Sequence, residues 1–464
     1  MSAVNFANIK KTLYYFKRNG FIRTWYTLLE RIQSKEEYTY VPVSEAALAD
    51  QRRKAEDMHT TFSVVVPAYR TGEVFLRDLL DSLEAQSYPR WELILADATE
   101  DDSVVQRLAG WMDGRTESRI RYIKLPANEG ISVNTNRALE YATGDYTGLL
   151  DHDDILTPDA LYEMAAHIEN AENAGTSPGM LYSDEDKCNG EGTVFYEPHY
   201  KEDFNRELLF SNNYICHFLV MKTPLIKELG FRKEYDGAQD YDLVLRAADR
   251  VLRGLQGYRE ANASVIHVPK ILYHWRCHDS STAANPQSKL YAYEAGKKAL
   301  QNLADDKGYP AVAEHTAHLG FYRLCYGAPI WKARPEIGLV GGRILEKGRM
   351  AGGRYGEDGT LFYKGLSGHF TGYMHRAVLR QDAWAVDIRC VMVRPELRER
   401  FEDVVGVPYV SRRIKAGDMG EVEIFDADTL PADADYLELS RRLAAATHEK
   451  GYGVLWDPCI TLKI

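Results

Sequence analysis

Residues 146–154 read Tyr-Thr-Gly-Leu-Leu-Asp-His-Asp-Asp and decide the expected fold. An apolar run that stops at three carboxylates and a histidine is typical of a buried strand that delivers acidic groups to the edge of a sheet. Carboxylates gathered there repel each other unless a cation or a donor-rich ligand lies between them. The Asp-x-Asp spacing of Asp151 and Asp153 therefore indicates Mg²⁺ or Mn²⁺ together with a phosphate-bearing ligand. The alternative is a solvated acidic turn, because Thr157-Pro158-Asp159 is a helix-start pattern.

The residues upstream alternate between strand and helix patterns. We expect strands at 62–67, 91–97, 120–125 and 146–150, with helices at 76–86, 104–112 and 131–143. Such alternation predicts an α/β domain with a mostly parallel sheet flanked by helices, in which ligands bind outside the carboxyl ends of the strands. Neither a Gly-x-Gly-x-x-Gly motif nor a Gly-x-x-x-x-Gly-Lys-Ser/Thr loop is present, so a Rossmann dinucleotide site and a P-loop are not indicated.

The composition limits the class of protein. With 464 residues, 45% of them hydrophobic, the chain is long enough for two or three domains, which we place at 1–60, 61–304 and 305–464. A net charge of −11 argues against nucleic acid as the partner. The six cysteines are scattered without a Cys-x-x-Cys motif, which fits a reducing cytoplasm, and no apolar run reaches the length of a membrane span.

Residues 1–35 differ from the rest of the chain. They carry seven Lys or Arg residues and one acid, Glu30, interleaved with aromatic side chains. This pattern is typical of an interfacial membrane anchor, here on the cytoplasmic face of a membrane. The alternative is a helical hairpin, broken at Asn19-Gly20, that packs on the main domain. Residues 36–60 are polar and are expected to form a helical linker.

A series of ordered motifs resembles the family 2 glycosyltransferases of the GT-A fold. The matching segments include 64–69 (Val-Val-Val-Pro-Ala-Tyr), Asp97, 128–139, 142–146, 150–154, 182–186, 236–243 and 272–278 (Leu-Tyr-His-Trp-Arg-Cys-His). Their order and spacing hold from about residue 62 to about residue 300. The resemblance is to bacterial members that build O-antigens, capsules and rhamnose-rich wall glycans. It implies a uridine- or thymidine-linked nucleotide-sugar donor and a glycan or lipid-linked glycan acceptor.

The resemblance also implies roles for the donor-side residues. Pro67, Ala68 and Tyr69 would line the base pocket and Asp97 would accept from the pyrimidine N–H, with Asn128 and Asn136 also on the nucleotide-sugar side. Asp151 would contact the ribose or phosphate, and Asp153 would ligate the metal. Arg276 would contact the diphosphate and His278 the metal, with Ser280 and Ser281 close by; His274 is the rival for the metal.

On the acceptor side the resemblance makes Asp240 the catalytic base. A carboxylate must take the proton of the acceptor hydroxyl, and the first turn of a helix also favours an acid there. Gln239 stands where the family commonly has Glu, so the pKa of Asp240 should be less raised than in a Glu-Asp pair. Glu185 and Trp275 are placed on the acceptor side. The cluster 184–186 is acceptor-side or structural, and a solvated turn is the main alternative.

Beyond residue 305 the sequence resembles the back half of a second GT-A domain. Asp435-Tyr436 with Arg441 echoes Asp240-Tyr241 with Arg246, but a second Asp-x-Asp and base pocket are missing. We expect this part to be inert and to serve acceptor binding, homodimerisation or docking on a partner enzyme.

Two other functions compete with sugar transfer. A sugar nucleotidyltransferase would need a Gly-rich basic loop after the first strand, and residues 68–72 (Ala-Tyr-Arg-Thr-Gly) fit that poorly. A non-catalytic scaffold of a glycan assembly complex is the other, and the presence of both Asp153 and Asp240 argues against it.

Overall fold

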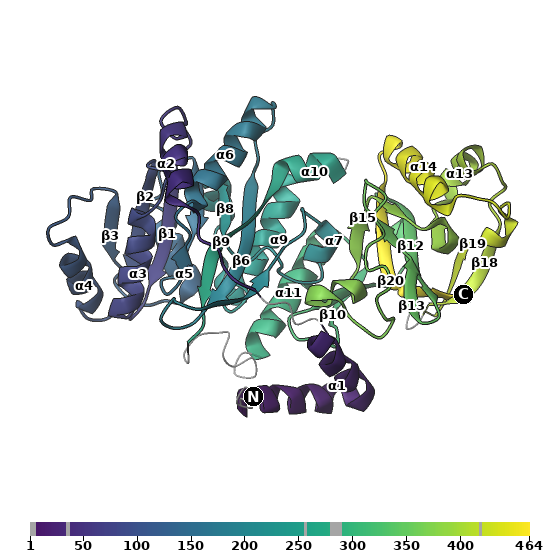
Figure 1. Ribbon diagram of the computed structural model, residues 1–464, viewed down its shortest axis with the longest axis horizontal. Coiled ribbons are helices and arrows are strands. Elements are labelled where there is room, and N and C mark those ends of the chain that lie inside the picture. The colour runs from purple at the N-terminus through teal and green to yellow at the C-terminus, as the bar shows by residue number, and fades with distance from the viewer. Residues whose placement is uncertain (1–5, 34–37, 255–257, 279–289, 417–419) are drawn as a thin grey trace.

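The computed structural model describes residues 6–33, 38–254, 258–278, 290–416 and 420–464. Figure 1 shows two lobes side by side, each built on its own sheet, with the N-terminal helix α1 beneath them. The helices are α1 (Phe6–Gln33), α2 (Glu45–Lys54), α3 (Glu73–Glu84), α4 (Ser103–Met112), α5 (Ile131–Leu139), α6 (Ala160–Asn173), α7 (Arg206–Leu209), α8 (Thr223–Leu229), α9 (Gln239–Val251), α10 (Tyr258–Ser264), α11 (Leu290–Asp306), α12 (Ile330–Ala333), α13 (Arg398–Val405) and α14 (Tyr436–Glu449).

The first lobe contains a nine-stranded sheet. Its order is β3-β2-β1-β4-β8-β6-β9-β5, with β7 paired to β6. The strands are β1 (Phe62–Ala68), β2 (Trp91–Asp97), β3 (Ile120–Lys124), β4 (Tyr146–Leu149), β5 (Ile155–Leu156), β6 (Met180–Cys188), β7 (Phe195–His199), β8 (Leu219–Lys222) and β9 (Val265–Arg276). Strands β1 to β4 are parallel to one another, and β8 runs antiparallel between β4 and β6.

The predicted strand–helix alternation is confirmed within a few residues of each boundary. Every residue of β1 is buried, as expected for a strand covered by helices on both faces. Helix α3 has the expected helical spacing and buries one leucine face, Leu76, Leu79, Leu80 and Leu83. Each fully buried leucine contributes about 1.5–3 kcal/mol relative to an exposed one, so this face fixes the helix on the sheet.

The second lobe has a smaller sheet of order β13-β12-β20-β15, with β17 paired to β12. Its strands are β12 (Ile337–Glu346), β13 (Arg349–Gly352), β15 (Gln381–Ala383), β17 (Val391–Val393) and β20 (Gly453–Lys463). The remaining strands form three pairs: β10 (Ala311–His315) with β11 (Tyr322–Tyr326), β14 (Arg354–Tyr355) with β16 (Ala385–Val386), and β18 (Ser411–Lys415) with β19 (Glu421–Phe425). A 3₁₀ turn, Ile388–Cys390, separates β16 from β17.

Helix α1 is broken at Gly20, whose φ of 76° is not helical, and this agrees with the expected break at Asn19-Gly20. Arg18 and Asn19 donate to the carbonyls of Thr316 and Ala317 at 3.1 Å, so the helix packs on the rest of the chain. Phe21, Trp25 and Ile32 nevertheless remain 69%, 51% and 71% exposed. Among the residues that the structure describes, no helix is long and apolar enough to cross a bilayer.

Candidate active site

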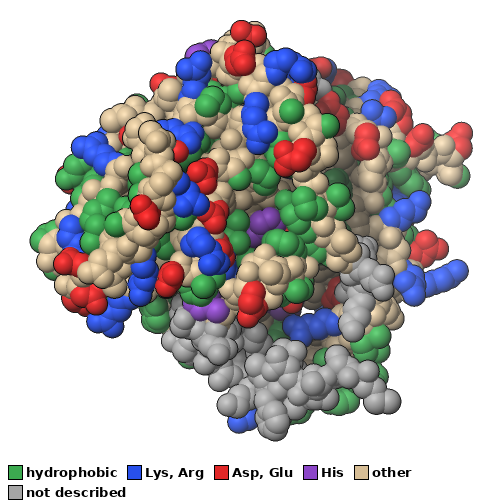
Figure 2. Space-filling view, turned by 60° about the vertical axis from the view of Figure 1, so that its left-hand side comes forward, with side chains coloured by type: hydrophobic (Ala, Val, Ile, Leu, Met, Phe, Trp, Pro, Cys, Tyr) green, Lys and Arg blue, Asp and Glu red, His purple; other side chains and the backbone are tan. Residues whose placement is uncertain are grey.

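The topology of the first sheet brings its polar segments to one edge. Strands β1, β2, β3, β4, β6 and β9 share one direction, so the residues after β4 and β9 and the last part of β6 meet there. Because β8 is antiparallel, the residues before it reach the same edge. Figure 2 shows a hollow on this side of the molecule, with acidic side chains around it and histidine inside it.

The three carboxylates after β4 have different surroundings. The Asp151 side chain is 54% exposed in the open cleft. The Asp153 side chain is 21% exposed, and its Oδ2 lies 2.8 Å from Nε2 of His278. Asp154 is buried and accepts from the Tyr273 hydroxyl and from the backbone N–H of Arg276, so it fastens this turn to β9. The turn is therefore solvated at Asp151 and buried at Asp154.

Asp153 and His278 form a donor pair that fits a divalent cation. One carboxylate oxygen and one imidazole nitrogen come from the ends of two neighbouring segments, and both ligand types suit Mn²⁺, with the carboxylate suiting Mg²⁺ as well. The His278 ring lies against Phe75, with ring centroids 4.9 Å apart, which fixes its orientation. Ser280 and Ser281, expected nearby, lie outside the described residues.

Asp240 lies in the first turn of α9. Its Oδ2 accepts from the Asn213 side-chain amide at 2.9 Å. Burial raises the pKa of Asp240 above its ordinary value, although the backbone N–H of Tyr241, the nearby His217 and Asn213 oppose that rise. A raised pKa brings a carboxylate closer to the range in which a general base works. Gln239, beside it, is half-buried and accepts from the Gly237 N–H through its side-chain oxygen at 2.8 Å.

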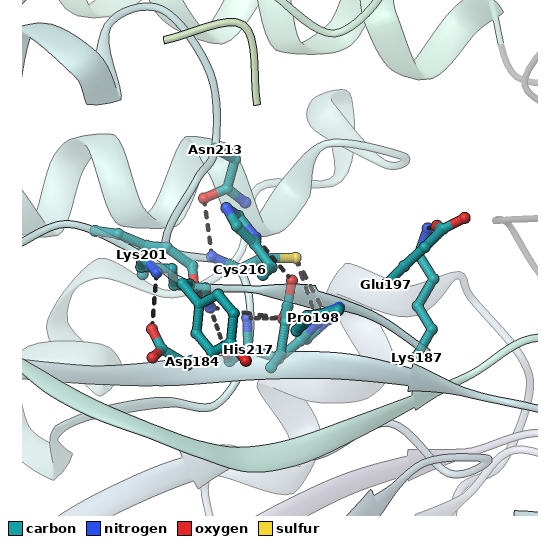
Figure 3. Close-up of polar contacts among 12 residues, drawn as sticks. Asp184, Lys187, Glu197, Pro198, Lys201, Asn213, Cys216 and His217 are labelled. Carbon is teal, nitrogen blue, oxygen red and sulfur yellow. Dashed lines mark hydrogen bonds and ion pairs between the residues drawn. The ribbon is translucent and has the colours of Figure 1, made fainter. Parts of the chain in front are cut away.

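His217 is a cleft residue that the sequence analysis missed. Its Nδ1 lies 3.0 Å from Oε2 of Glu185, its Nε2 lies 3.9 Å from Oδ2 of Asp151, and its ring stacks on Tyr273. Burial alone would lower the pKa of His217, but Cys216 and Glu185 raise it well above its ordinary value. Figure 3 shows His217 and Cys216 within this network of polar contacts. The sequence signal that could have identified His217 is its position just before β8, but that strand was not predicted from the sequence.

Glu185 is an internal counter-ion rather than part of a solvated turn. It is 5% exposed and lies near His217, His199 at 3.3 Å and the Lys201 ammonium at 3.6 Å. Burial opposes ionisation, but Lys201 and the two histidines hold the pKa of Glu185 well below its usual range. Glu185, Cys216 and His217 offer donor atoms within 4.8 Å of one another, yet Lys201 already supplies a positive charge to this cluster.

Two of the expected ligand residues are buried in the protein instead. His274 is 3% exposed, and its Nδ1 lies 2.5 Å from Asp186, so it is a core histidine and not the rival metal ligand. Arg276 is fully buried, donates to Asp78 and to the Gly190 carbonyl, and lies over the Phe75 ring. Successive strand residues face opposite sides, so His274 and Arg276 share one face of β9, opposite to Tyr273 and Trp275, which lie against His217.

The segments expected to hold the base follow β1, β2 and β3. Pro67 and Ala68 are buried, and the Tyr69 hydroxyl donates to Glu100 at 2.9 Å. Asp97 has no exposed surface and accepts from the Thr99 N–H, the Tyr122 hydroxyl and Lys124. A base N–H can therefore reach Asp97 only if Tyr122 or Lys124 moves aside.

The side chains of the two asparagines expected on the donor side are already hydrogen-bonded within the protein. Asn128 is exposed, and its side-chain oxygen accepts from the Gly130 N–H and from Asn134. Asn136 both donates to and accepts from the backbone of Phe231, at 2.8 and 2.7 Å. We therefore correct its assignment to a structural one, because it ties α5 to the segment that leads to α9. Trp275 is half-buried beside His217, with ring centroids 5.7 Å apart.

A parallel-rich sheet with acids, a histidine and a helix-borne carboxylate at its carboxyl edge defines a transferase of the GT-A type. The model of the family described as "Glycosyl transferase family 2" matches residues 63–230. The putative glycosyltransferase EpsE of Bacillus subtilis (strain 168) is 30% identical over 199 residues, which cover 41% of this chain and 68% of EpsE. The chain belongs to glycosyltransferase family 2.

Two longer proteins also match. An uncharacterized protein, y4gI, of Sinorhizobium fredii (strain NBRC 101917 / NGR234) is 40% identical over 240 residues, 52% of this chain and 25% of that protein. The O-antigen biosynthesis protein RfbC of Myxococcus xanthus is 32% identical over 282 residues, 60% of this chain and 20% of RfbC. The chain thus spans a quarter or less of the length of these two relatives.

Proposed function

We propose that the chain transfers a sugar from a uridine or thymidine diphosphate donor to a hydroxyl of a growing, lipid-linked bacterial surface polysaccharide, with inversion and with a divalent metal. The observation that carries the proposal is the meeting of Asp153, His278 and Asp240 at one cleft, with Asp151 and His217 between them in charge contact. The surrounding protein displaces water from Asp151, which raises its pKa. The positive charge of His217 lowers that pKa, and the negative charges of Asp153 and Asp240 raise it. Such a cluster of carboxylates favours a cation-bearing ligand.

On this proposal Asp153 and His278 would hold the metal. The ion would supply positive charge to the diphosphate as it leaves. Asp151 would face the ribose or the diphosphate from its exposed position beside them. His217, kept as a cation by Glu185, would add a positive charge to the floor of the same cleft. The donor would then lie with its anionic end on the side of Asp153.

Asp240 would act on the acceptor. The acceptor oxygen forms a bond to the anomeric carbon while the sugar–phosphate bond breaks, and Asp240 takes the hydroxyl proton. The nucleoside diphosphate leaves with the electron pair of the broken bond. Because attack and departure occur on opposite faces of the sugar, the configuration inverts, as in direct displacement at an anomeric carbon. Asn213 holds the Asp240 carboxylate in place for this step.

Two observations support the acceptor class and the location. RfbC is named for O-antigen biosynthesis, and α1 presents exposed apolar side chains next to arginines, the pattern of a helix that lies on a membrane surface. A hexose or a rhamnose would fit the family resemblance. The C-terminal lobe would then position the acceptor, a second copy of the chain or a partner enzyme.

A thermal-shift screen tests the donor site. UDP, dTDP, GDP and CDP are added with and without Mn²⁺ to the full chain and to Asp153→Asn. One nucleotide should raise the melting temperature only with Mn²⁺, and Asp153→Asn should lose that shift, while Asp113→Asn, on the exposed end of α4, should keep it. No shift with any nucleotide would overturn the metal-dependent proposal and favour the scaffold function.

A further inference from the structure

A second cavity lies away from the transfer cleft. Its volume is about 1080 Å³, and it is enclosed by α1, the β10–β11 hairpin and the second sheet. None of Asp151, Asp153, Asp240 and His278 is among the described residues that line it. A space of this size holds a ligand as large as a lipid head group with part of its chain.

Helix α1 contributes residues to one side of this cavity, and it lies beneath the two lobes (Figure 1). Its first part is fastened by Arg18 and Asn19 to the carbonyls of Thr316 and Ala317. Its last part is fastened by Glu30, whose carboxylate accepts from the backbone N–H groups of Thr371 and Gly372. Between these points Tyr26 stacks on His369, with ring centroids 4.3 Å apart. The half of α1 that follows the break at Gly20 is therefore held just before its start and near its end.

The cavity has more positive than negative side chains. Five arginines line it, against three carboxylates. Of those carboxylates, Glu207 is paired with Arg334, and Asp457 is shared by Arg323 and Arg380. Glu314, the third, is exposed.

Arg343 carries the clearest uncompensated charge. It donates to the Thr461 hydroxyl and to the Gly368 carbonyl, and no carboxylate of the described residues lies within ion-pair distance of it. Burial lowers the pKa of Arg343. Arg343 is part-buried, so an anion in the cavity could reach it, and a phosphate oxygen pair suits the planar geometry of a guanidinium.

Part of the wall is apolar. Val340, Leu455 and Ile460 are buried core residues that face the cavity. Ile22 lines the mouth and is itself 68% exposed, beside exposed Phe21 and Trp25 on the same helix. Apolar side chains therefore line both the inner wall of the cavity and, through Ile22, its α1 side.

We propose that this cavity binds a phosphorylated amphiphile, with its phosphate at Arg343 and its hydrocarbon chain along the apolar part of the wall toward α1, where Arg18 and Arg23 add positive charge at the rim. The inference rests on the proposed function only where the amphiphile is taken to be the lipid anchor of the acceptor. Neither a bare phosphate nor a neutral hydrocarbon matches both halves of the wall. The site is separate from the donor cleft and adds a second, non-catalytic contact to the same substrate.

Binding of geranylgeranyl phosphate to the full chain, measured by calorimetry, tests the proposal. The alcohol geranylgeraniol and inorganic phosphate should each bind at least about 10-fold more weakly, since each satisfies half of the wall. Arg343→Met should weaken binding about 10-fold or more, and Arg18→Gln with Arg23→Gln should also weaken it. Lys17→Gln, an exposed charge on the same helix outside the cavity, should leave it unchanged. Binding to phosphatidylglycerol vesicles, measured with the same variants, tests whether a phosphate on a membrane surface is bound instead.

The outcomes separate this site from the donor site. A Mn²⁺-dependent nucleotide shift that persists in Arg343→Met shows that the variant is folded and that the donor site is intact. Equal binding by wild type and both arginine variants would overturn the cavity proposal. Binding of inorganic phosphate as tight as that of the isoprenoid phosphate would overturn it too. Loss of vesicle binding in Lys17→Gln to the same extent as in Arg18→Gln/Arg23→Gln would show that surface charge on α1 causes the binding. That outcome would overturn the cavity proposal.

Discussion

The two lobes contain the same local arrangement with opposite electrostatics. In the first, α9 precedes β9, which runs parallel to β6; in the second, α14 precedes β20, which runs parallel to β12. Both helices begin beside an Asp-Tyr pair. Asp435 turns back and accepts from the N–H groups of Leu437 and Glu438, so it only caps its own helix. Asp240 instead faces the cleft, where Asn213 holds it.

An acid at each sheet shows the same difference: Asp457, on β20, and Asp151, just after β4. Asp457 on β20 is 1% exposed and is bound by both Arg323 and Arg380, which hold its pKa well below the usual range despite its burial. Asp151 in the first lobe has His217 at 3.9 Å and a raised pKa. One lobe thus neutralises its carboxylate internally, and the other leaves negative charge exposed for a ligand. The pattern of residues is shared, but the chemistry depends on what surrounds it.

The largest effect expected from this comparison is on catalysis. Asp240→Asn should lower the transfer rate by about 10²–10⁴-fold, because an amide cannot take the acceptor proton. Nucleotide binding should be retained, since Asp240 does not belong to the donor pair. Steady-state transfer with the identified donor measures the rate. Asp435→Asn is the matched control and should keep the rate within about twofold. Turnover of Asp240→Asn at the wild-type rate would remove Asp240 from the base role.

The sequence predicted the first lobe well because its signals are local. The strands from 62 to 150 and the helices between them follow from periodicity, and the edge that collects Asp151 and Asp153 follows from parallel order. The orientation of β9 side chains and the buried environment of residues 184–186 depend on long-range packing. His217 and the structural roles of Asn136, His274 and Arg276 therefore could not be predicted from spacing alone.

A second prediction concerns stability. Asp457→Asn should lower the free energy of unfolding by about 3–5 kcal/mol, because it removes the counter-ion of the buried Arg380 and the part-buried Arg323. Chemical denaturation at pH 7 measures this difference. A carboxylate with a depressed folded pKa stabilises the fold above its unfolded pKa, so the difference from wild type should shrink only below about pH 4.

In the same experiment, Asp240→Asn should change the free energy of unfolding in the opposite direction. Its raised pKa means that the ionised carboxylate destabilises the folded state at neutral pH. Asp240→Asn should therefore be at least as stable as wild type at pH 7, whereas Asp457→Asn is less stable. Equal destabilisation by both substitutions would contradict the view that one lobe holds its charge for a ligand and the other for its own structure.

The smallest effect expected concerns the residue beside the base. The rate should rise with pH as Asp240 ionises, so the acidic limb of the rate profile reports its pKa. Gln239→Glu places a second negative charge next to Asp240, with its oxygen held near the Gly237 N–H. This like charge should move the acidic limb upward by about one pH unit, because it opposes ionisation of Asp240. Gln239→Met, which changes the side chain without adding charge, should leave the limb in place. If both variants move it equally, packing around Asp240 rather than charge sets its pKa, and the electrostatic contrast between the two lobes would not extend to the base itself.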